Sequence, residues 1–150
     1  MFSFLQTSTP ILPKGFILET NKPPSPEELN KLLSKCKEAT HSPKRLKIAL
    51  DRSFCCLSIV DTRDGKLAGF VRATTDHGLN ANLWTLVADP GKNQKQLLSF
   101  LINRILLILK KELPGCSISA SSPVSSIEPL QSQGFLLDPN GIRAMAFKLR

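Results

Sequence analysis

Apolar residues recur along the chain in two rhythms, one typical of helices and one typical of strands. The longest helical pattern runs over 94–112, where apolar positions every three or four residues form a wide stripe. Two shorter patterns follow Ser25-Pro26 and Ser42-Pro43. Both pairs favour a helix start, because serine caps the first turn and proline fits its first position. A further short helix is predicted over 126–132.

Strand-like segments surround these helices. They are apolar or alternating runs bounded by Asp, Gly and Pro, and they predict strands over 15–19, 54–60, 66–75, 82–88, 116–120, 135–137 and 144–149. The turn at 61–65 makes the second and third a hairpin, and the turn at 138–141 joins the last two. The order β-α-α-β-β-β-α-β-α-β-β predicts an α/β fold on one mixed sheet flanked by helices.

This layout predicts one core between the strand 82–88 and the long helix. The expected contacts join Trp84, Leu86 and Ala88 on the strand to Leu97, Leu101 and Ile105 on the helix. The strand is expected to separate from its neighbour beyond Ala88.

Residues 1–13 differ from the rest, because they are rich in Ser, Thr and Pro and carry no charged side chain. They are interpreted as a flexible leader before a domain of 14–150. The leader has the Ser and Thr of a transit peptide but no Arg, so chloroplast and cytoplasm both stay open. No uncharged apolar run approaches the roughly 18–20 residues that a membrane span needs.

Charge and rare residues narrow the chemistry. Of 150 residues, 20 are Lys or Arg and 12 are Asp or Glu, a net charge of +8. This balance attracts anions such as a phosphorylated cofactor, an acidic partner or nucleic acid. Nucleic acid is disfavoured because no aromatic ladder accompanies the basic residues. Four irregularly spaced cysteines and two isolated histidines indicate reduced structural thiols and no metal site.

Several segments, taken in order, resemble one family. They are Ala-Leu-Asp-Arg-Ser at 49–53, Gly-Lys-Leu-Ala-Gly-Phe-Val-Arg-Ala-Thr-Thr-Asp-His at 65–77, Asn-Leu-Trp-Thr-Leu-Val-Ala-Asp-Pro at 82–90, Gln-Gly-Phe at 133–135 and Asp-Pro-Asn-Gly-Ile-Arg-Ala-Met at 138–145. Together they resemble the GNAT superfamily of N-acetyltransferases, in particular plant plastid members of the nuclear-shuttle-interacting and serotonin N-acetyltransferase type. The likeness covers residues 14–147.

The resemblance implies a GNAT-like mixed central sheet and acetyl transfer from acetyl-CoA to an amine. The acceptor would be a protein N-terminus, a lysine or a small amine. The implied cofactor-binding residues are Leu86, Val87, Ala88, Asn93, Gln94, Lys95, Gln96, Leu97 and Leu98.

The cofactor motif departs from the family pattern Gln/Arg-x-x-Gly-x-Gly/Ala. The two glycine positions hold Gln96 and Leu98, and a glycine often seen just before them is Gln94. Glycines let backbone N–H groups approach a pyrophosphate at a helix N-terminus, so side chains there narrow the cradle. Lys92 and Lys95 add charge that offsets part of this loss. Impaired acetyl-CoA binding is therefore expected.

The acid and base of the family are also replaced. Leu130 stands where members commonly have a tyrosine acid, and Thr85 stands where the named relatives have an acidic residue. Asp76 and His77, in a loop, are the remaining catalytic candidates. The alternative for them is a turn-capping Asp and a solvated His. Direct attack by the amine leaves some rate without either group.

Three functions stay open at this point. The first is an N-acetyltransferase, weak because its cradle and acid are degenerate. The second is a non-catalytic GNAT-fold protein that binds a partner. The third is a basic nucleic-acid-binding module, which would need a clustered basic face. The sequence does not indicate an oligomeric state.

Overall fold

A five-stranded sheet, in the order β1-β2-β3-β4-β5, forms the centre of the protein. The computed structural model describes residues 8–20, 22–121, 123–142 and 144–149. The first four strands are antiparallel neighbours, and β5 runs parallel to β4. The strands are Phe16–Glu19 (β1), Cys55–Asp61 (β2), Leu67–Thr75 (β3), Asn80–Ala88 (β4) and Ser117–Ala120 (β5).

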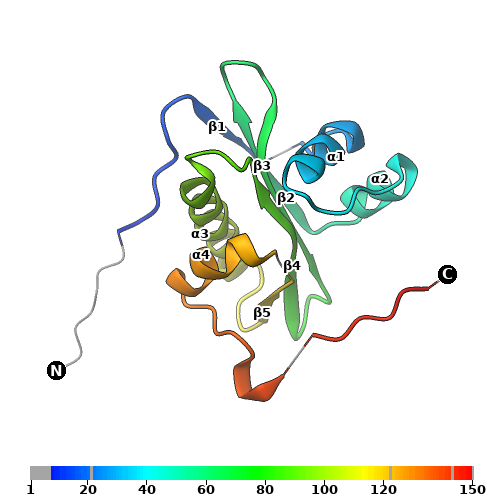
Figure 1. Ribbon diagram of the computed structural model, residues 1–150. Helices are drawn as coiled ribbons and strands as arrows, with labels where there is room; N and C mark the ends of the chain where they lie inside the picture. The colour runs from blue at the N-terminus through cyan, green and yellow to red at the C-terminus, as the bar shows by residue number, and fades with distance from the viewer. Residues whose placement is uncertain (1–7, 21, 122, 143, 150) are drawn as a thin grey trace.

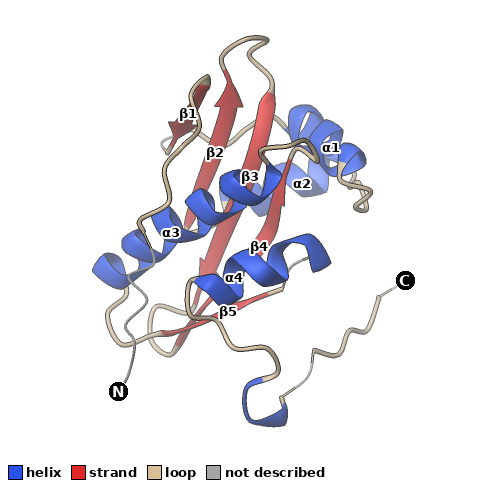
Figure 2. Ribbon diagram, turned by 60° about the vertical axis from the view of Figure 1, so that its left-hand side comes forward, coloured by secondary structure: helices blue, strands red, loops and turns tan. Residues whose placement is uncertain are grey.

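Helices cover both faces of this sheet. Helix α3 (Gln94–Glu112) crosses one face beside the short α4 (Ile127–Ser132), and α1 (Pro26–Lys35) and α2 (Pro43–Asp51) lie on the other (Figures 1 and 2). Two single turns of 3-10 helix, η1 (Val124–Ser126) and η2 (Pro139–Gly141), complete the elements. The α/β class and the mixed sheet flanked by helices are confirmed.

The local start signals place the helices correctly. Ser25 and Glu28 form a reciprocal capping box at the start of α1. Ser42 accepts a hydrogen bond from the Arg45 backbone N–H at the start of α2. Helix α3 has the bounds that its apolar stripe predicts, and its buried residues include Leu97, Leu101 and Ile105.

Helix α3 packs closely against β3 at Gly69. A Cβ atom at Gly69 would lie 3.2 Å from Leu101 Cδ1 and 3.4 Å from the Ile59 side chain. The missing side chain therefore lets the helix approach the middle of the sheet, where Leu101 and Ile59 are fully buried.

A bulge in β4 changes which of its residues face α3. Thr85 has a φ of +56°, and the register between β3 and β4 shifts at this point. As a result Leu83, Leu86 and Ala88 belong to the core beneath α3. Trp84 lies on the other face of the sheet, where its ring contacts the Arg72 guanidinium and its Nε1 donates a hydrogen bond to Thr74 Oγ1. The prediction that Trp84 shares a core with Leu97 is wrong, because the bulge breaks the alternation.

The separation of β4 from β5 also begins earlier than predicted. Their pairing covers only Asn80–Leu83 on β4, and the Ser121 N–H donates to the Leu83 carbonyl at its end. The strands therefore separate after Leu83, and the predicted separation beyond Ala88 is wrong.

The predicted strands at 135–137 and 144–149 are not formed. Residues 135–137 are irregular, and the described residues 144–149 extend away from the sheet (Figure 1). Most of their large apolar side chains are exposed, with Phe147 88% accessible, whereas Phe135 packs against the core. Asp138 and Asn140 have φ values of +46° and +54°, and the predicted turn forms η2. A lone hairpin is only marginally stable in water, and four-residue β5 offers a short edge to pair with.

The packing of α3 predicts that truncating a side chain on its buried face destabilises the protein far more than truncating one on its exposed face. Leu101→Ala should lower the free energy of unfolding by about 2–5 kcal/mol, because Leu101 is fully buried. Leu107→Ala, on the exposed face of the same helix, should change it by less than about 0.5 kcal/mol. Urea unfolding followed by circular dichroism measures both. Equal losses in the two variants would contradict this placement of α3.

Candidate cofactor and acyl-transfer site

The gap between β4 and β5 provides an open strand edge at the centre of the molecule. Beyond Leu83 the edge of β4 that faces away from β3 has no strand partner among the described residues. This stretch, Trp84–Ala88, leads directly to the first turn of α3. Unpaired strand edges present backbone N–H and C=O groups to whatever lies beside them. An extended ligand beside this edge would therefore find backbone groups to hydrogen-bond to.

The first turn of α3 is suited to an anion. Its N-cap residue, Asn93, makes no side-chain capping hydrogen bond, and no acidic residue lies in the turn. Lys92 and Lys95 stand there instead. The Gln94 N–H already donates to the Gly91 carbonyl, but the positive end of the helix dipole attracts negative charge, and Lys92 beside it adds to that attraction. Helix α1 provides the contrast, because it carries a capping box and two acidic residues.

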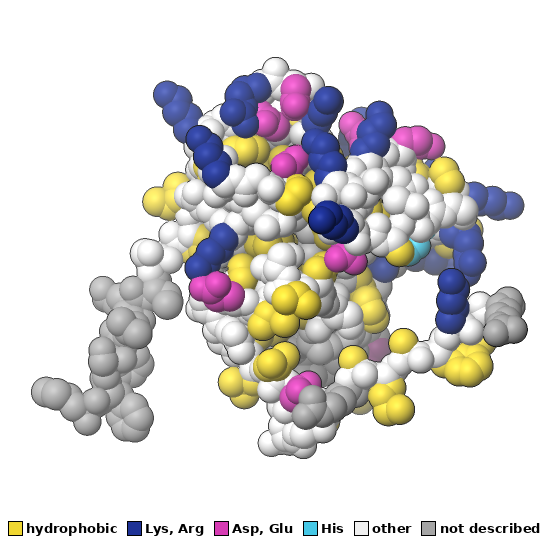
Figure 3. Space-filling model, viewed as in Figure 1, with side chains coloured by type: hydrophobic (Ala, Val, Ile, Leu, Met, Phe, Trp, Pro, Cys, Tyr) yellow, Lys and Arg dark blue, Asp and Glu magenta, His cyan; other side chains and the backbone are white. Residues whose placement is uncertain are grey.

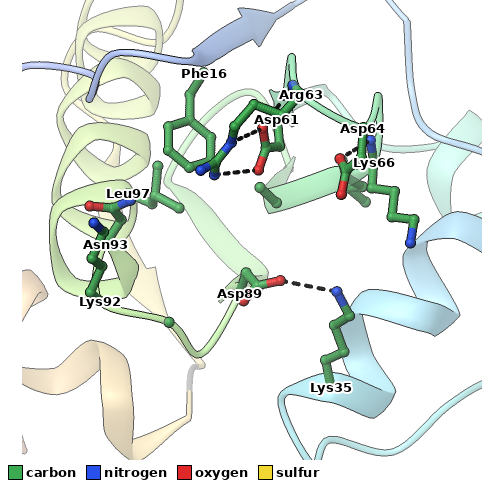
Figure 4. Close-up of a pocket in the computed structure, with 13 residues that line it drawn as sticks. Phe16, Lys35, Asp61, Arg63, Asp64, Lys66, Asp89, Lys92, Asn93 and Leu97 are labelled. Carbon is green, nitrogen blue, oxygen red and sulfur yellow. Dashed lines mark hydrogen bonds and ion pairs between the residues drawn. The ribbon is translucent and has the colours of Figure 1, made fainter.

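Glutamine side chains partly occupy this turn. Gln94 Nε2 donates to the Ala88 carbonyl at 3.1 Å, and Gln96 Nε2 donates to the Ile11 carbonyl at 3.2 Å. Lys95 Nζ lies 2.5 Å from Glu128 on α4. Leu97 and Leu98 are buried in the core, and Leu97 also forms part of the wall of the pocket shown in Figure 4. The structure thus brings the predicted cofactor residues to one place, with the side chains of Leu97 and Leu98 turned into the core.

The Ala88 carbonyl, at the end of β4, accepts hydrogen bonds from residues of two other segments of the chain. Besides Gln94 it accepts a hydrogen bond from Cys36 Sγ on the residue after α1, at 3.1 Å. Burial, followed by the nearby Asp89 carboxylate, raises the pKa of the Cys36 thiol to about 11. The thiol therefore stays protonated near neutral pH and acts as a hydrogen-bond donor, not as a nucleophile.

A pocket reaches the same end of β4 from the side of the β2–β3 hairpin (Figure 4). Lys35 pairs with Asp89 at 3.2 Å, and Arg63 pairs with Asp61 at 2.7 Å. Lys66 and Lys92 also line the pocket. Lys and Arg side chains crowd this part of the surface, at the top of Figure 3, with acidic side chains among them. Strand order places this pocket across β4 from the gap beside β5.

Thr85 and Arg72 form a strained, polar centre within the strands. A β-branched residue with a φ of +56° is unusual, and such strain concentrates at functional sites. Arg72 Nε donates to Thr85 Oγ1 at 3.2 Å, which holds the bulge in place. Sequence reasoning did not select Arg72. Its signal was an arginine inside an otherwise apolar strand segment, Leu67–Ala73.

Asp76 and His77 lie at the opposite end of β4 from α3. The Asp76 carboxylate accepts backbone hydrogen bonds from Gly78, Leu79 and Asn80, which lower its pKa. The His77 ring makes an edge contact with Phe54. Five residue steps, about 16 Å at the rise of a strand, separate Asn80 from Thr85. The geometry gives Asp76 the turn-capping role that the sequence also allowed.

Other features limit the chemistry of the site. Leu130, at the position of the family's tyrosine acid, is buried in the core. All four cysteines are free thiols. In the described ranges no three His, Cys, Asp or Glu side chains are arranged to hold a metal ion. A search of the same ranges finds no helix with the length and apolar character to span a bilayer.

Comparisons with known proteins bear on the family and the fold of the chain. The chain is 31% identical over 135 residues to the uncharacterized N-acetyltransferase ycf52 of Pyropia yezoensis, covering 88% of this chain and 76% of the relative. It is 33% identical over 84 residues to GCN5-related N-acetyltransferase 2, chloroplastic, of Arabidopsis thaliana, covering 55% of this chain and 32% of that protein. No protein-family model matches the chain.

A solved structure from meticillin-resistant Staphylococcus aureus, described as a probable acetyltransferase, superposes with a TM-score of 0.75 at 14% identity. The superposition covers 89% of this chain and all of that one. The fold and the Pyropia relative together show that the chain belongs to the GNAT family of N-acetyltransferases. It is thus an acyltransferase of GNAT type, the class that its sequence resembles.

A structural role for Asp76 predicts that its loss affects stability and not turnover. Asp76→Ala should lower the melting temperature, because three backbone N–H groups lose their acceptor, and should leave acetyl transfer within about twofold. The folded pKa is lowered, so the stabilisation is present above the ordinary aspartate pKa and fades as pH falls. The melting difference between variant and parent should therefore shrink toward acidic pH. A tenfold loss of turnover in Asp76→Ala would instead make Asp76 a catalytic residue.

Proposed function

We propose that this protein is an acetyl-CoA-dependent N-acetyltransferase with a weakened cofactor cradle. The observation that carries the proposal is the continuous path from the strained bulge at Thr85, along the unpaired edge of β4, to the uncapped first turn of α3. Family membership supports the reaction class, and this path supports the position of the cofactor.

The residues on this path fit acetyl-CoA in charge and in backbone geometry. The N–H groups that open α3, with Lys92 and Lys95, would hold the pyrophosphate. The edge of Leu86–Ala88 that has no strand partner would hydrogen-bond to the extended arm, which would compete with Gln94 and Cys36 for the Ala88 carbonyl. Gln94 and Gln96 reduce this fit, because their side chains occupy the turn and bind backbone carbonyls. Acetyl-CoA, when bound, supplies a thioester whose carbonyl carbon bonds to the amine nitrogen as the C–S bond breaks and the amine proton leaves with the thiolate.

At the bulge in β4 the protein would position the amine and the thioester, but it offers no side chain that could accept the amine proton. No carboxylate or imidazole of the described residues hydrogen-bonds to Arg72, Trp84 or Thr85. The amine must therefore arrive deprotonated, and the protein contributes orientation and exclusion of water. The acceptor would be an amine of a protein or of a small molecule.

The cradle predicts a specific response of cofactor affinity to substitution. Gln94→Gly with Gln96→Gly should tighten acetyl-CoA binding by roughly tenfold, because backbone N–H groups become accessible. This gain comes with a stability cost of up to about 1 kcal/mol for each glycine. Leu98 stays unchanged, since it is buried in the core. Isothermal titration calorimetry with acetyl-CoA measures the affinity.

A charge-matched pair provides the control for this experiment. Lys92→Ala with Lys95→Ala should weaken binding, whereas Lys110→Ala with Lys111→Ala, at the other end of the same helix, should not. If the parent already binds at micromolar levels and the glycine variant binds no tighter, the narrowed cradle is refuted. If neither parent nor glycine variant binds, the non-catalytic binding protein becomes the better account.

The missing base predicts a simple pH profile. Because deprotonation of the amine limits attack, log(kcat/KM) should rise with pH and level off at the pKa of the acceptor's own amine. Two acceptors with different amine pKa values should level off at correspondingly different pH values. A plateau at the same pH for both would reveal a titrating group of the protein.

The relative named as chloroplastic supports a chloroplast location, which we propose over the cytoplasm. The full chain fused at its C-terminus to a fluorescent protein should colocalise with chlorophyll fluorescence.

A further inference from the structure

Arg72 carries an unpaired charge on the face of the sheet that α1 and α2 partly cover. Its guanidinium carbon lies 6.0 Å from the centroid of the Trp84 ring, and its Nε donates to Thr85 Oγ1 at 3.2 Å. Trp84 is fixed in turn, because its Nε1 donates to Thr74 Oγ1 at 2.7 Å. The arginine is thus held over an aromatic ring and directly beside the bulge.

No acidic side chain neutralises this charge. The four ion pairs of the described residues use Lys35, Lys47, Arg63 and Lys95. Arg72 lies within 4.0 Å of none of the carboxylates in the described ranges, and it is only partly exposed. Buried charges are usually paired, since removing them from water costs free energy. Burial lowers the pKa of Arg72, the direction expected when no acid offsets the desolvation.

The geometry leaves most of the guanidinium available to a ligand. Only the Nε–H has a hydrogen-bond acceptor among the described residues, so the terminal nitrogens present four further N–H donors. These donors form a planar fork that matches the two oxygens of a carboxylate.

An approach to Arg72 exists on the same face. A hollow on this face is lined by Thr20, Lys22, Pro23, Leu50, Asp51, Ser53 and Cys56, and Cys56 is the residue opposite Arg72 in the β2–β3 register. Lys22 puts a positive charge on the wall of this hollow, and the negative charge of Asp51 on the same wall is paired with Lys47. The hollow lies on the face of α1 and α2, opposite the core that α3 covers.

We propose that Arg72 selects acceptor amines that carry a carboxylate, holding that carboxylate while the amine reaches the bulge at Thr85. This inference rests on the proposed acetyl transfer and names its substrate class. The acceptor is an amino-acid-like molecule or the N-terminus of a peptide that begins with an acidic residue. The net charge of +8 attracts such molecules.

Matched pairs of acceptors test the selection. γ-Aminobutyrate and n-butylamine have similar amines and differ in the carboxylate, and peptides beginning with Asp or Asn differ in the same way. Wild-type kcat/KM should favour the carboxylate member by roughly tenfold or more in at least one pair, as expected for a charge-assisted contact. The pair that shows the preference identifies the source, a small molecule or a peptide. Equal rates within both pairs would overturn the proposal.

Variants connect the preference to Arg72. Arg72→Gln keeps a donor for Thr85 but removes the charge, so the ratio of kcat/KM between the two members of a pair should fall to about one, because any loss that both members share cancels in the ratio. Thr85→Asp should have the same effect on the preference, because its carboxylate would pair with Arg72, and Asp tolerates a positive φ better than Thr. Arg104→Gln, an exposed arginine on α3, is the charge-matched control and should keep the preference. A preference that survives Arg72→Gln would also overturn the proposal.

Fluorescence separates this inference from the proposed function. Trp84 is the single tryptophan of the chain, and it lies against the Arg72 guanidinium. Titration with γ-aminobutyrate should change its emission in the wild type and not in Arg72→Gln, with n-butylamine at equal ionic strength as the blank. If this change occurs but no amine is acetylated, the carboxylate site stands and the transferase function fails. If amines are acetylated but neither the preference nor the emission change occurs, the function stands and the carboxylate site fails.

Discussion

The left-handed backbone at Thr85 is the constraint on which the rest of the site depends. It divides β4 into two halves whose side chains alternate out of phase. The later half sends Leu86 and Ala88 into the core under α3, while Trp84 stays with Arg72 on the other face. Backbone strain in a β-branched residue costs free energy, and the Arg72–Thr85 hydrogen bond offsets part of it. The same short segment thus fixes the packing of the sheet and the position of its polar residues.

The separation of β4 from β5 connects this constraint to function. Because β5 pairs only with Asn80–Leu83, the strand edge that carries the bulge stays open and ends at the first turn of α3. That turn has no side-chain cap and no acidic residue, so the positive end of its dipole favours an anion. Gln94 and Gln96 in this turn donate to the backbone carbonyls of Ala88 and Ile11, which is the basis of the narrowed cradle that we propose. The acceptor site that we propose at Arg72 lies on the other face of β4 from the core under α3.

Signals within a few residues of each other predicted much of this fold, and the errors arose where the structure depends on residues far apart in the sequence. Ser25-Pro26 and the stripe of α3 fixed their helices, because caps and amphipathic spacing act within a few residues. The face of Trp84 was missed, since one left-handed residue reverses the alternation without any glycine to mark it. The prediction of two C-terminal strands was wrong, because the alternation of apolar and polar residues at 144–149 does not show whether a sheet edge is available to pair with them. Arg72 could not be selected from the sequence, because only the pairing of β3 with β4 and its shifted register show that the arginine lies beside Thr85 with no carboxylate near it.

The central claim is that the open edge of β4 and the first turn of α3 form one acetyl-CoA site. Amide chemical shifts of the ¹⁵N-labelled protein, recorded during titration with acetyl-CoA, test it residue by residue. The account predicts the largest shifts at the backbone N–H groups of Leu86–Ala88 and of Lys95 and Gln96, with small shifts around Lys66 in the hairpin pocket. Shifts confined to that pocket, or none at millimolar acetyl-CoA, would contradict it.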